Sequence, residues 1–160
     1  MFKKILVPLD GSELAAKILP QVVDLAKAHK AEVTLLNVSD GALQESTPAM
    51  IQEAFALETK RCQAMLDKVA KDLETQGVQA SATCVEGSAA REIIAYADAN
   101  GMDLIAMATH GKGEVAWVLG SVAEKVVSHA TVPVLLFRVM EVKVPPSKED
   151  FLALLDRGIP

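Results

Sequence analysis

Three short segments carry the residues that could take part in binding chemistry, and each directly follows an apolar run: residues 8–12, 38–40 and 108–113. Asp10 is a hydrogen-bond acceptor suited to hydroxyl groups. Gly111 and Gly113 allow the backbone to approach a ligand closely. If the three segments meet in space, they form a cleft of the size that a nucleotide needs.

A fourth segment, Gly120-Ser121, begins a stretch of helical composition. The first backbone N–H groups of a helix and its dipole favour a phosphate at that end. The same pair is also an ordinary way to begin and cap a helix. Both interpretations of Ser121 stay open on the sequence alone.

Each remaining polar candidate also has a structural explanation. Asp10 after a strand is more often a helix cap or a turn former than a ligand contact. Lys112 either neutralises a phosphate or is an exposed loop lysine. His110 stands without metal-ligand neighbours, so we expect a solvated or hydrogen-bonded loop residue. Trp117 either packs inward or covers the cleft.

Catalytic and metal-binding patterns do not emerge. Ser12 and Ser88 lack the Gly-x-Ser-x-Gly context of a hydrolase nucleophile. Cys62 and Cys84 have no Cys-x-x-Cys spacing and no basic cluster beside them, so we expect two small apolar residues in a reduced setting. The sequence therefore predicts a binding protein without a catalytic residue or a metal site, and not an enzyme.

The elements that would position these segments alternate between strand and helix. Short apolar runs predict strands, and amphipathic stretches between Gly and Pro breaks predict helices. The predicted strands are 5–7, 33–38, 78–85, 104–108 and 132–137, and the predicted helices are 12–29, 48–75, 89–99 and 121–130.

Continuous apolar strands indicate a parallel sheet that is buried on both faces. Right-handed crossovers then place helices on both faces, and ligands bind at the carboxyl ends of the strands. We predict one open α/β domain over residues 1–140. Residues 141–160 form an extension in which Ser147-Lys148-Glu149-Asp150 precedes a short apolar helix.

Composition excludes several classes of function. The chain of 160 residues has 16 basic and 21 acidic residues and a net charge of -5, which disfavours nucleic acid and anionic lipid as partners. The first apolar run ends at Pro8, before the length of a signal peptide or a membrane span is reached. We expect a cytoplasmic protein with no nucleic-acid or membrane partner.

The opening Ile5–Ser12, the segment Leu104–Gly111 and the ending Gly120–Leu135 together resemble the universal stress protein family, over about residues 1–138. The resemblance implies a Rossmann-like fold of the adenine nucleotide alpha hydrolase type with strand order 3-2-1-4-5. It also implies a homodimer that pairs the last strand, Val134–Phe137, across a two-fold axis.

The ATP-binding branch of this family has the signature Gly, two residues, Gly, nine residues, Gly, then Ser or Thr. By resemblance, Asp10 would accept a hydrogen bond from the ribose, while three positions would line the adenine pocket and four would hold the phosphates of ATP, which Mg²⁺ accompanies. The adenine positions are Pro8, Val38 and Met107, and the phosphate positions are Gly111, Gly120, Ser121 and Val122.

Two positions depart from that signature. Ala108 stands where the first glycine belongs, and eight residues, 112–119, separate Gly111 from Gly120. The first hypothesis is therefore a stress-response module that binds ATP and regulates partners. The alternative is a nucleotide-independent dimeric stress protein that works through its surfaces.

Overall fold

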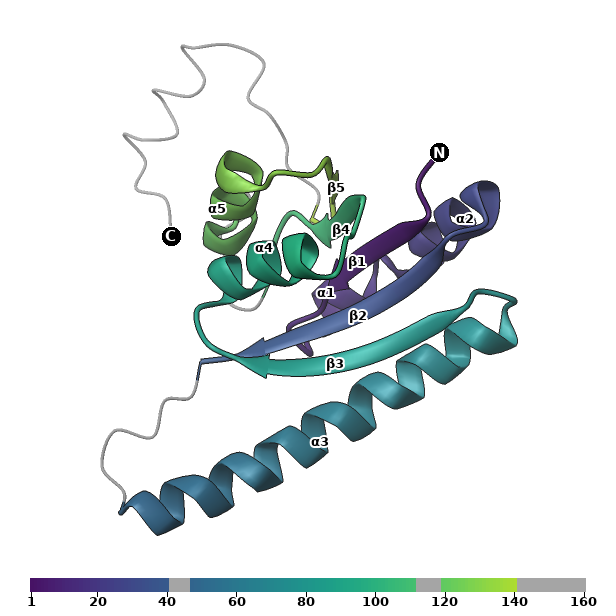
Figure 1. Cartoon of the computed structure of the whole chain (residues 1–160). Helices are drawn as coiled ribbons and strands as arrows, with labels where there is room; N and C mark the ends of the chain where they lie inside the picture. Colours follow the sequence, from purple (N-terminus) through teal and green to yellow (C-terminus); the bar gives the residue numbers. More distant parts are fainter. Residues whose placement is uncertain (41–46, 112–118, 141–160) are drawn as a thin grey trace, which may run out of the picture.

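The fold is a three-layer α/β sandwich, seen here in a computed structural model (Figure 1). The structure describes residues 1–40, 47–111 and 119–140. Lys112, Gly113, Trp117 and the predicted extension 141–160 lie outside these residues. The sheet is parallel, with five strands in the order β3-β2-β1-β4-β5. The predicted fold class and strand order are confirmed.

Ten elements follow one another along the chain: β1 Lys4–Pro8, α1 Glu13–Ala16, α2 Leu19–His29, β2 Glu32–Ser39, α3 Pro48–Thr75, β3 Ala80–Glu86, α4 Ala89–Ala99, β4 Leu104–Ala108, α5 Ser121–His129 and β5 Val134–Phe137. The bounds of α3 and β4 agree with the sequence prediction. The last strand begins two residues later than predicted, after Pro133, which has no N–H to donate to a ladder.

The predicted first helix is wrong as a single element, because α1 ends at Ala16 and α2 begins at Leu19. Pro20 occupies the first turn of α2. A proline there is favourable, but it cannot donate to a carbonyl in the preceding turn. The break lets α2 leave α1 at a new angle and still cover the sheet with Val22, Val23 and Ala26.

Successive residues of the strands contribute in turn to two hydrophobic cores, one on each face of the sheet. Ile5, Val7 and Leu35 pack with the buried residues of α2 and α3, while Leu6 and Ile105 pack with those of α4 and α5. This alternation follows from the two-residue period of a strand. Because both faces are covered, β4 is apolar and buried throughout, and β1 has the buried apolar run Ile5-Leu6-Val7 after the exposed Lys4.

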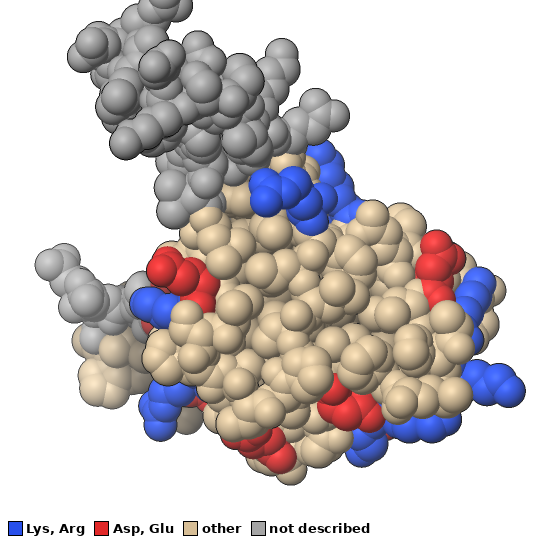
Figure 2. Space-filling view, turned by 90° about the horizontal axis from the view of Figure 1, so that it is seen from above, with Lys and Arg blue, Asp and Glu red and all other residues tan. Residues whose placement is uncertain are grey.

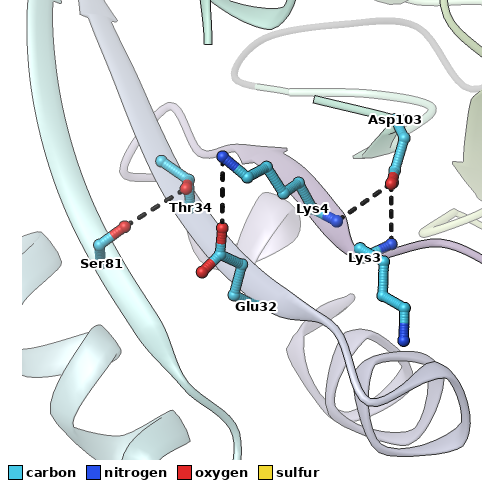
Figure 3. Close-up of polar contacts among 6 residues, drawn as sticks. All are labelled: Lys3, Lys4, Glu32, Thr34, Ser81 and Asp103. Atoms are coloured by element: carbon cyan, nitrogen blue, oxygen red, sulfur yellow. Dashed lines mark hydrogen bonds and ion pairs between the residues drawn. The ribbon is translucent and has the colours of Figure 1, made fainter. Parts of the chain in front are cut away.

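A polar cluster secures the amino-terminal edge of the sheet (Figure 3). The backbone N–H groups of Lys3 and Lys4 donate to the Asp103 carboxylate at 2.8 and 3.2 Å. The Lys4 ammonium lies 3.7 Å from Glu32, and Thr34 shares a hydrogen bond with Ser81. These contacts connect β1, β2, β3 and the residue before β4 near their amino-terminal ends, on the opposite side of the sheet from the carboxyl ends.

A disulfide joins Cys62 of α3 to Cys84 of β3, so the expectation of two separate thiols is wrong. The two residues are 22 positions apart, with a Cα–Cα distance of 6.4 Å. The sequence interpretation failed because it considered only local features, namely Cys-x-x-Cys spacing and neighbouring basic residues. The antiparallel return of β3 along α3 brings the two side chains together, and Gln63 also donates to the Ala82 carbonyl beside them.

Candidate functional site

A cavity of about 270 Å³ opens at the carboxyl ends of β1, β2 and β4. This is the edge at which parallel α/β sheets bind ligands. Three helices (α1, α4 and α5) and the strand ends contribute to its wall. The lining residues are Pro8, Leu9, Asp10, Ala15, Leu36, Val38, Ala89, Ile93, Met107, Ala108, Thr109, His110, Gly111, Ser121, Val122 and Ala123.

Seven of the eight predicted site residues line this one cavity: Pro8, Asp10, Val38, Met107, Gly111, Ser121 and Val122. Gly120 does not line it and instead forms the N-cap of α5. The N–H of Gly120 donates to the Thr109 carbonyl at 3.0 Å, and the N–H of Thr109 donates to Phe137 at 2.9 Å. The first bond holds the start of α5 against the end of β4, and the second joins that end to β5.

Asp10 is fixed by the turn that follows β1. The backbone N–H and the hydroxyl of Ser12 both donate to its Oδ1, at 2.9 and 2.5 Å. Ser12 in turn accepts from the N–H of Ala15 and so caps α1. The capping role considered for Asp10 therefore belongs to Ser12, while Oδ2 of Asp10 faces Gly111.

Gly111 meets Asp10 at close range. A β-carbon built on Gly111 would overlap the Oδ2 atom of that carboxylate. Since the backbone of Gly111 does not have the positive φ that favours glycine, space is the reason that a glycine is needed here. The contact brings the loop after β1 and the loop after β4 to the same point of the cavity.

The chemistry of the wall divides into two parts. Leu36, Val38, Ile93 and Met107 form an apolar part suited to a flat, weakly polar group such as a base. Asp10, Gly111 and the first turn of α5 form a polar part. The carboxylate suits hydroxyl groups, and the helix start suits an anion.

His110 is buried, and its Nδ1 shares a hydrogen bond of 2.8 Å with the Thr109 hydroxyl. Of the two expectations for His110, the hydrogen-bonded one is confirmed and the solvated one is wrong. Among the described residues, no group of three or more His, Cys, Asp or Glu side chains has the arrangement of a metal site. Nor does any helix there have the length and apolarity of a membrane span.

Sequence reasoning missed several residues of the wall. Leu36 lies two positions before Val38 on β2, so the strand period could have identified it. Ala89 and Ile93 come from α4, one turn apart, after the turn that follows β3. The order of elements predicts this helix, but which of its faces reaches the cavity depends on packing that only the structure reveals.

Comparison with known proteins identifies the relatives of this chain. The model of the Universal stress protein family matches residues 1–138. A universal stress protein of Methanocaldococcus jannaschii is 36% identical over 144 residues, which cover 86% of this chain and 83% of the relative.

Solved structures agree in fold. One universal stress protein from the same organism has a TM-score of 0.80 and 32% identity, and it covers 89% of this chain and 99% of its own. A universal stress protein solved in complex with cAMP is 16% identical with a TM-score of 0.61, over 87% of this chain and 98% of its own. The sequence match and the shared fold together establish that this chain belongs to the universal stress protein family.

Proposed function

We propose that the protein binds ATP, accompanied by Mg²⁺, in the cavity at the carboxyl ends of β1, β2 and β4, and that it acts in the stress response as a cytoplasmic regulatory module. The observation that carries this proposal is the convergence of Asp10, Gly111 and the first turn of α5 on one cavity. Function rests on binding in this proposal, and no catalytic role is assigned to any residue.

The adenosine part of the ligand lies inside the cavity. The cavity volume of about 270 Å³ is just below the lower end of the range for small-molecule sites, about 300 Å³. Val38 and Met107 contact the base together with Pro8, and Asp10 accepts hydrogen bonds from the ribose hydroxyls.

The phosphates extend along Gly111 toward Ser121 and Val122, where the start of α5 favours negative charge. Gly120 acts indirectly on the phosphates, because it caps α5 and keeps the start of that helix against β4. Ala108 is buried in the wall, so its methyl group takes part of the space that a glycine would leave open. This lowers affinity without closing the site.

Titration calorimetry with ATP and Mg²⁺ tests the proposal on the nucleotide-free protein and two variants. Asp10→Ala removes the ribose acceptor, and Gly120→Val disturbs the N-cap of α5, so each should weaken binding about tenfold or more, which corresponds to about 1.4 kcal/mol. Asp24→Ala is the matched control, because Asp24 is an exposed carboxylate of α2 outside the cavity wall. Unchanged affinity in both site variants contradicts the proposal.

A second candidate function, a dimeric interaction module, is supported by the edge strand β5. The N–H groups of Ile105 and Thr109 donate to the carbonyls of Pro133 and Phe137. Since backbone direction alternates along a strand, the N–H and C=O groups of Val134 and Leu136 point away from β4. In Figure 1 the strands follow one another upward from β3 to β5, so the view from above is taken from the β5 side of the sheet. That view shows a broad area without charged side chains (Figure 2).

Amide hydrogen exchange tests this dimer residue by residue. The N–H groups of Leu135 and Phe137 face β4 and should exchange slowly in any state. Val134 and Leu136 should exchange slowly only if a second copy pairs with β5, and their protection should increase with protein concentration. Rapid exchange at both positions at high protein concentration would exclude the pairing.

A further inference from the structure

The first half of α3 presents an apolar surface that the domain does not cover. Every residue from Pro48 to Arg61 is exposed, and the first buried residue of this helix is Leu66. Among the described residues, five of the eight large hydrophobic side chains that are exposed belong to α3: Met50, Ile51, Phe55, Leu57 and Met65.

Geometry explains why this half is uncovered. The 28 residues of α3 span about 42 Å, whereas the seven residues of β3 span about 23 Å. The helix therefore extends past the sheet, as Figure 1 shows. The disulfide at Cys62 anchors the helix directly after Arg61, where its exposed half ends.

The exposed half can be divided into heptads of the kind that pair two helices, with apolar side chains at three of the five a and d positions. Ile51, Glu58 and Met65 recur every seven residues, and Ala54 and Arg61 recur at the complementary spacing. These are the a and d positions of a coiled coil. We call these five residues the α3 seam. The other large apolar residues flank it at positions e and g, namely Met50, Phe55 and Leu57.

The opposite side of the same segment is polar or small: Gln52, Glu53, Ala56, Thr59, Lys60 and Gln63. Leu66 and Leu73, which pack on the sheet, continue the face of Gln52 and Thr59 at seven-residue spacing and lie about a third of a turn from the centre of the seam. A second helix can therefore approach Ile51, Ala54, Glu58 and Arg61 without displacing α3 from β3. At Met65, whose thioether lies beside Gly11, it reaches the edge of the domain.

The two charged residues of the seam determine which partner fits. Glu58 and Arg61 have opposite charges and are both exposed, and no ion pair engages either of them within the described residues. In an antiparallel pair of identical helices, an a residue packs against a d residue of the partner. Centring the pair between Glu58 and Arg61 places each Glu58 beside the partner's Arg61, and each Ala54 beside the partner's Met65. A parallel pair would instead oppose like charges.

We propose that the α3 seam is a self-association surface, on which α3 of a second copy of this chain packs antiparallel with Glu58 paired to Arg61. A polar layer of this kind specifies register and orientation at some cost in stability. The seam spans only about two heptads, so the association is weak and depends on concentration. It lies on the β3 side of the sheet, at the opposite edge from β5, and so does not compete with pairing through β5.

Sedimentation velocity over a range of concentrations tests the proposal on the full chain with its disulfide intact. Ala54→Glu places a charge in the seam, and Ala56→Glu is the matched control, because it makes the same change on an exposed residue of the polar side. We expect the mass of the wild type and of Ala56→Glu to double as the protein concentration rises. The species that doubles is the monomer, or the β5-linked dimer if β5 pairs as well. Ala54→Glu should lose that doubling.

A charge exchange tests the register. Glu58→Arg and Arg61→Glu should each weaken the association by about tenfold or more, and the double variant should restore it, because the opposite charges meet again. The proposal is overturned if the wild type does not double in mass, or if Ala54→Glu and Ala56→Glu behave alike. It is equally overturned if Ala54→Glu instead abolishes binding to anionic lipid vesicles and leaves the mass unchanged, since the partner would then be a membrane.

Discussion

The carboxylate of Asp10 lies against Gly111, so closely that a β-carbon on Gly111 would overlap Oδ2. The two residues come from loops after β1 and β4, about a hundred positions apart in the sequence. Their contact sets the direction of Asp10, the only carboxylate among the described residues of the cavity wall. The geometry of this pair decides how a ribose would be held.

Gly111→Ala should therefore reduce the affinity for ATP by about tenfold, or about 1.4 kcal/mol. The methyl group pushes the carboxylate out of place, while the backbone conformation remains accessible to alanine. The double variant Asp10→Ala, Gly111→Ala should bind no more weakly than Asp10→Ala alone, because the overlap is then gone. Calorimetry on the three variants checks this, and wild-type affinity in Gly111→Ala would contradict it.

Ala108→Gly should raise the affinity for ATP. Ala108 lines the cavity and is buried, so the change enlarges the space at the position where the family signature has a glycine. A glycine within a strand also lowers the free energy of unfolding by about 0.5–1 kcal/mol. Calorimetry and thermal unfolding on the same sample separate the two effects. Lower affinity with an intact fold would show that the methyl group contacts the ligand favourably.

Opening the Cys62–Cys84 disulfide should destabilise the domain. A cross-link that closes a loop of 22 residues restricts the unfolded chain and contributes about 3 kcal/mol in the entropy model. For a domain of this size that corresponds to a decrease in Tm of roughly 6–12 °C. Thermal unfolding with and without a dithiol reductant measures it.

The control for that measurement is the double variant Cys62→Ser, Cys84→Ser, whose Tm should be low and should not respond to the reductant. If the reductant lowers the Tm of this variant as much as that of the wild type, the disulfide is not the cause.

The proposed cytoplasmic location makes a prediction about the same two cysteines. Cytoplasmic thiols reduce accessible disulfides, and both cysteines are only partly buried. Alkylation of cells during lysis should therefore modify a substantial fraction of Cys62 and Cys84, as measured by mass spectrometry. A protein recovered fully as the disulfide would argue for an oxidising compartment.

Much of this fold follows from local patterns in the sequence. The apolar run Leu104–Ala108 is typical of a strand buried on both faces, and the composition of Pro48–Thr75 favours a long helix. Asp10 and Gly111 could be placed together because carboxyl ends of parallel strands share one edge of the sheet. The break between α1 and α2 was also accessible, since Pro20 marks it.

Other features depend on packing between distant segments. The disulfide requires that α3 return alongside β3 in one particular register, and no local pattern encodes this. The contribution of Ile93 to the cavity requires the rotation of α4 about its own axis. The exposed half of α3 follows from a mismatch between the lengths of a helix and a strand, which is apparent only once both have been placed.

The most direct test of the central claim is a ¹H–¹⁵N NMR titration of the nucleotide-free protein with ATP and Mg²⁺. Saturable shifts of backbone amides should concentrate on Asp10, Val38, Gly111, Ser121 and Val122, while amides of α2 and of the exposed half of α3 stay unchanged. The absence of saturable shifts, or their concentration away from the carboxyl ends of β1, β2 and β4, would contradict the nucleotide site and leave the interaction surfaces of β5 and α3 as the basis of function.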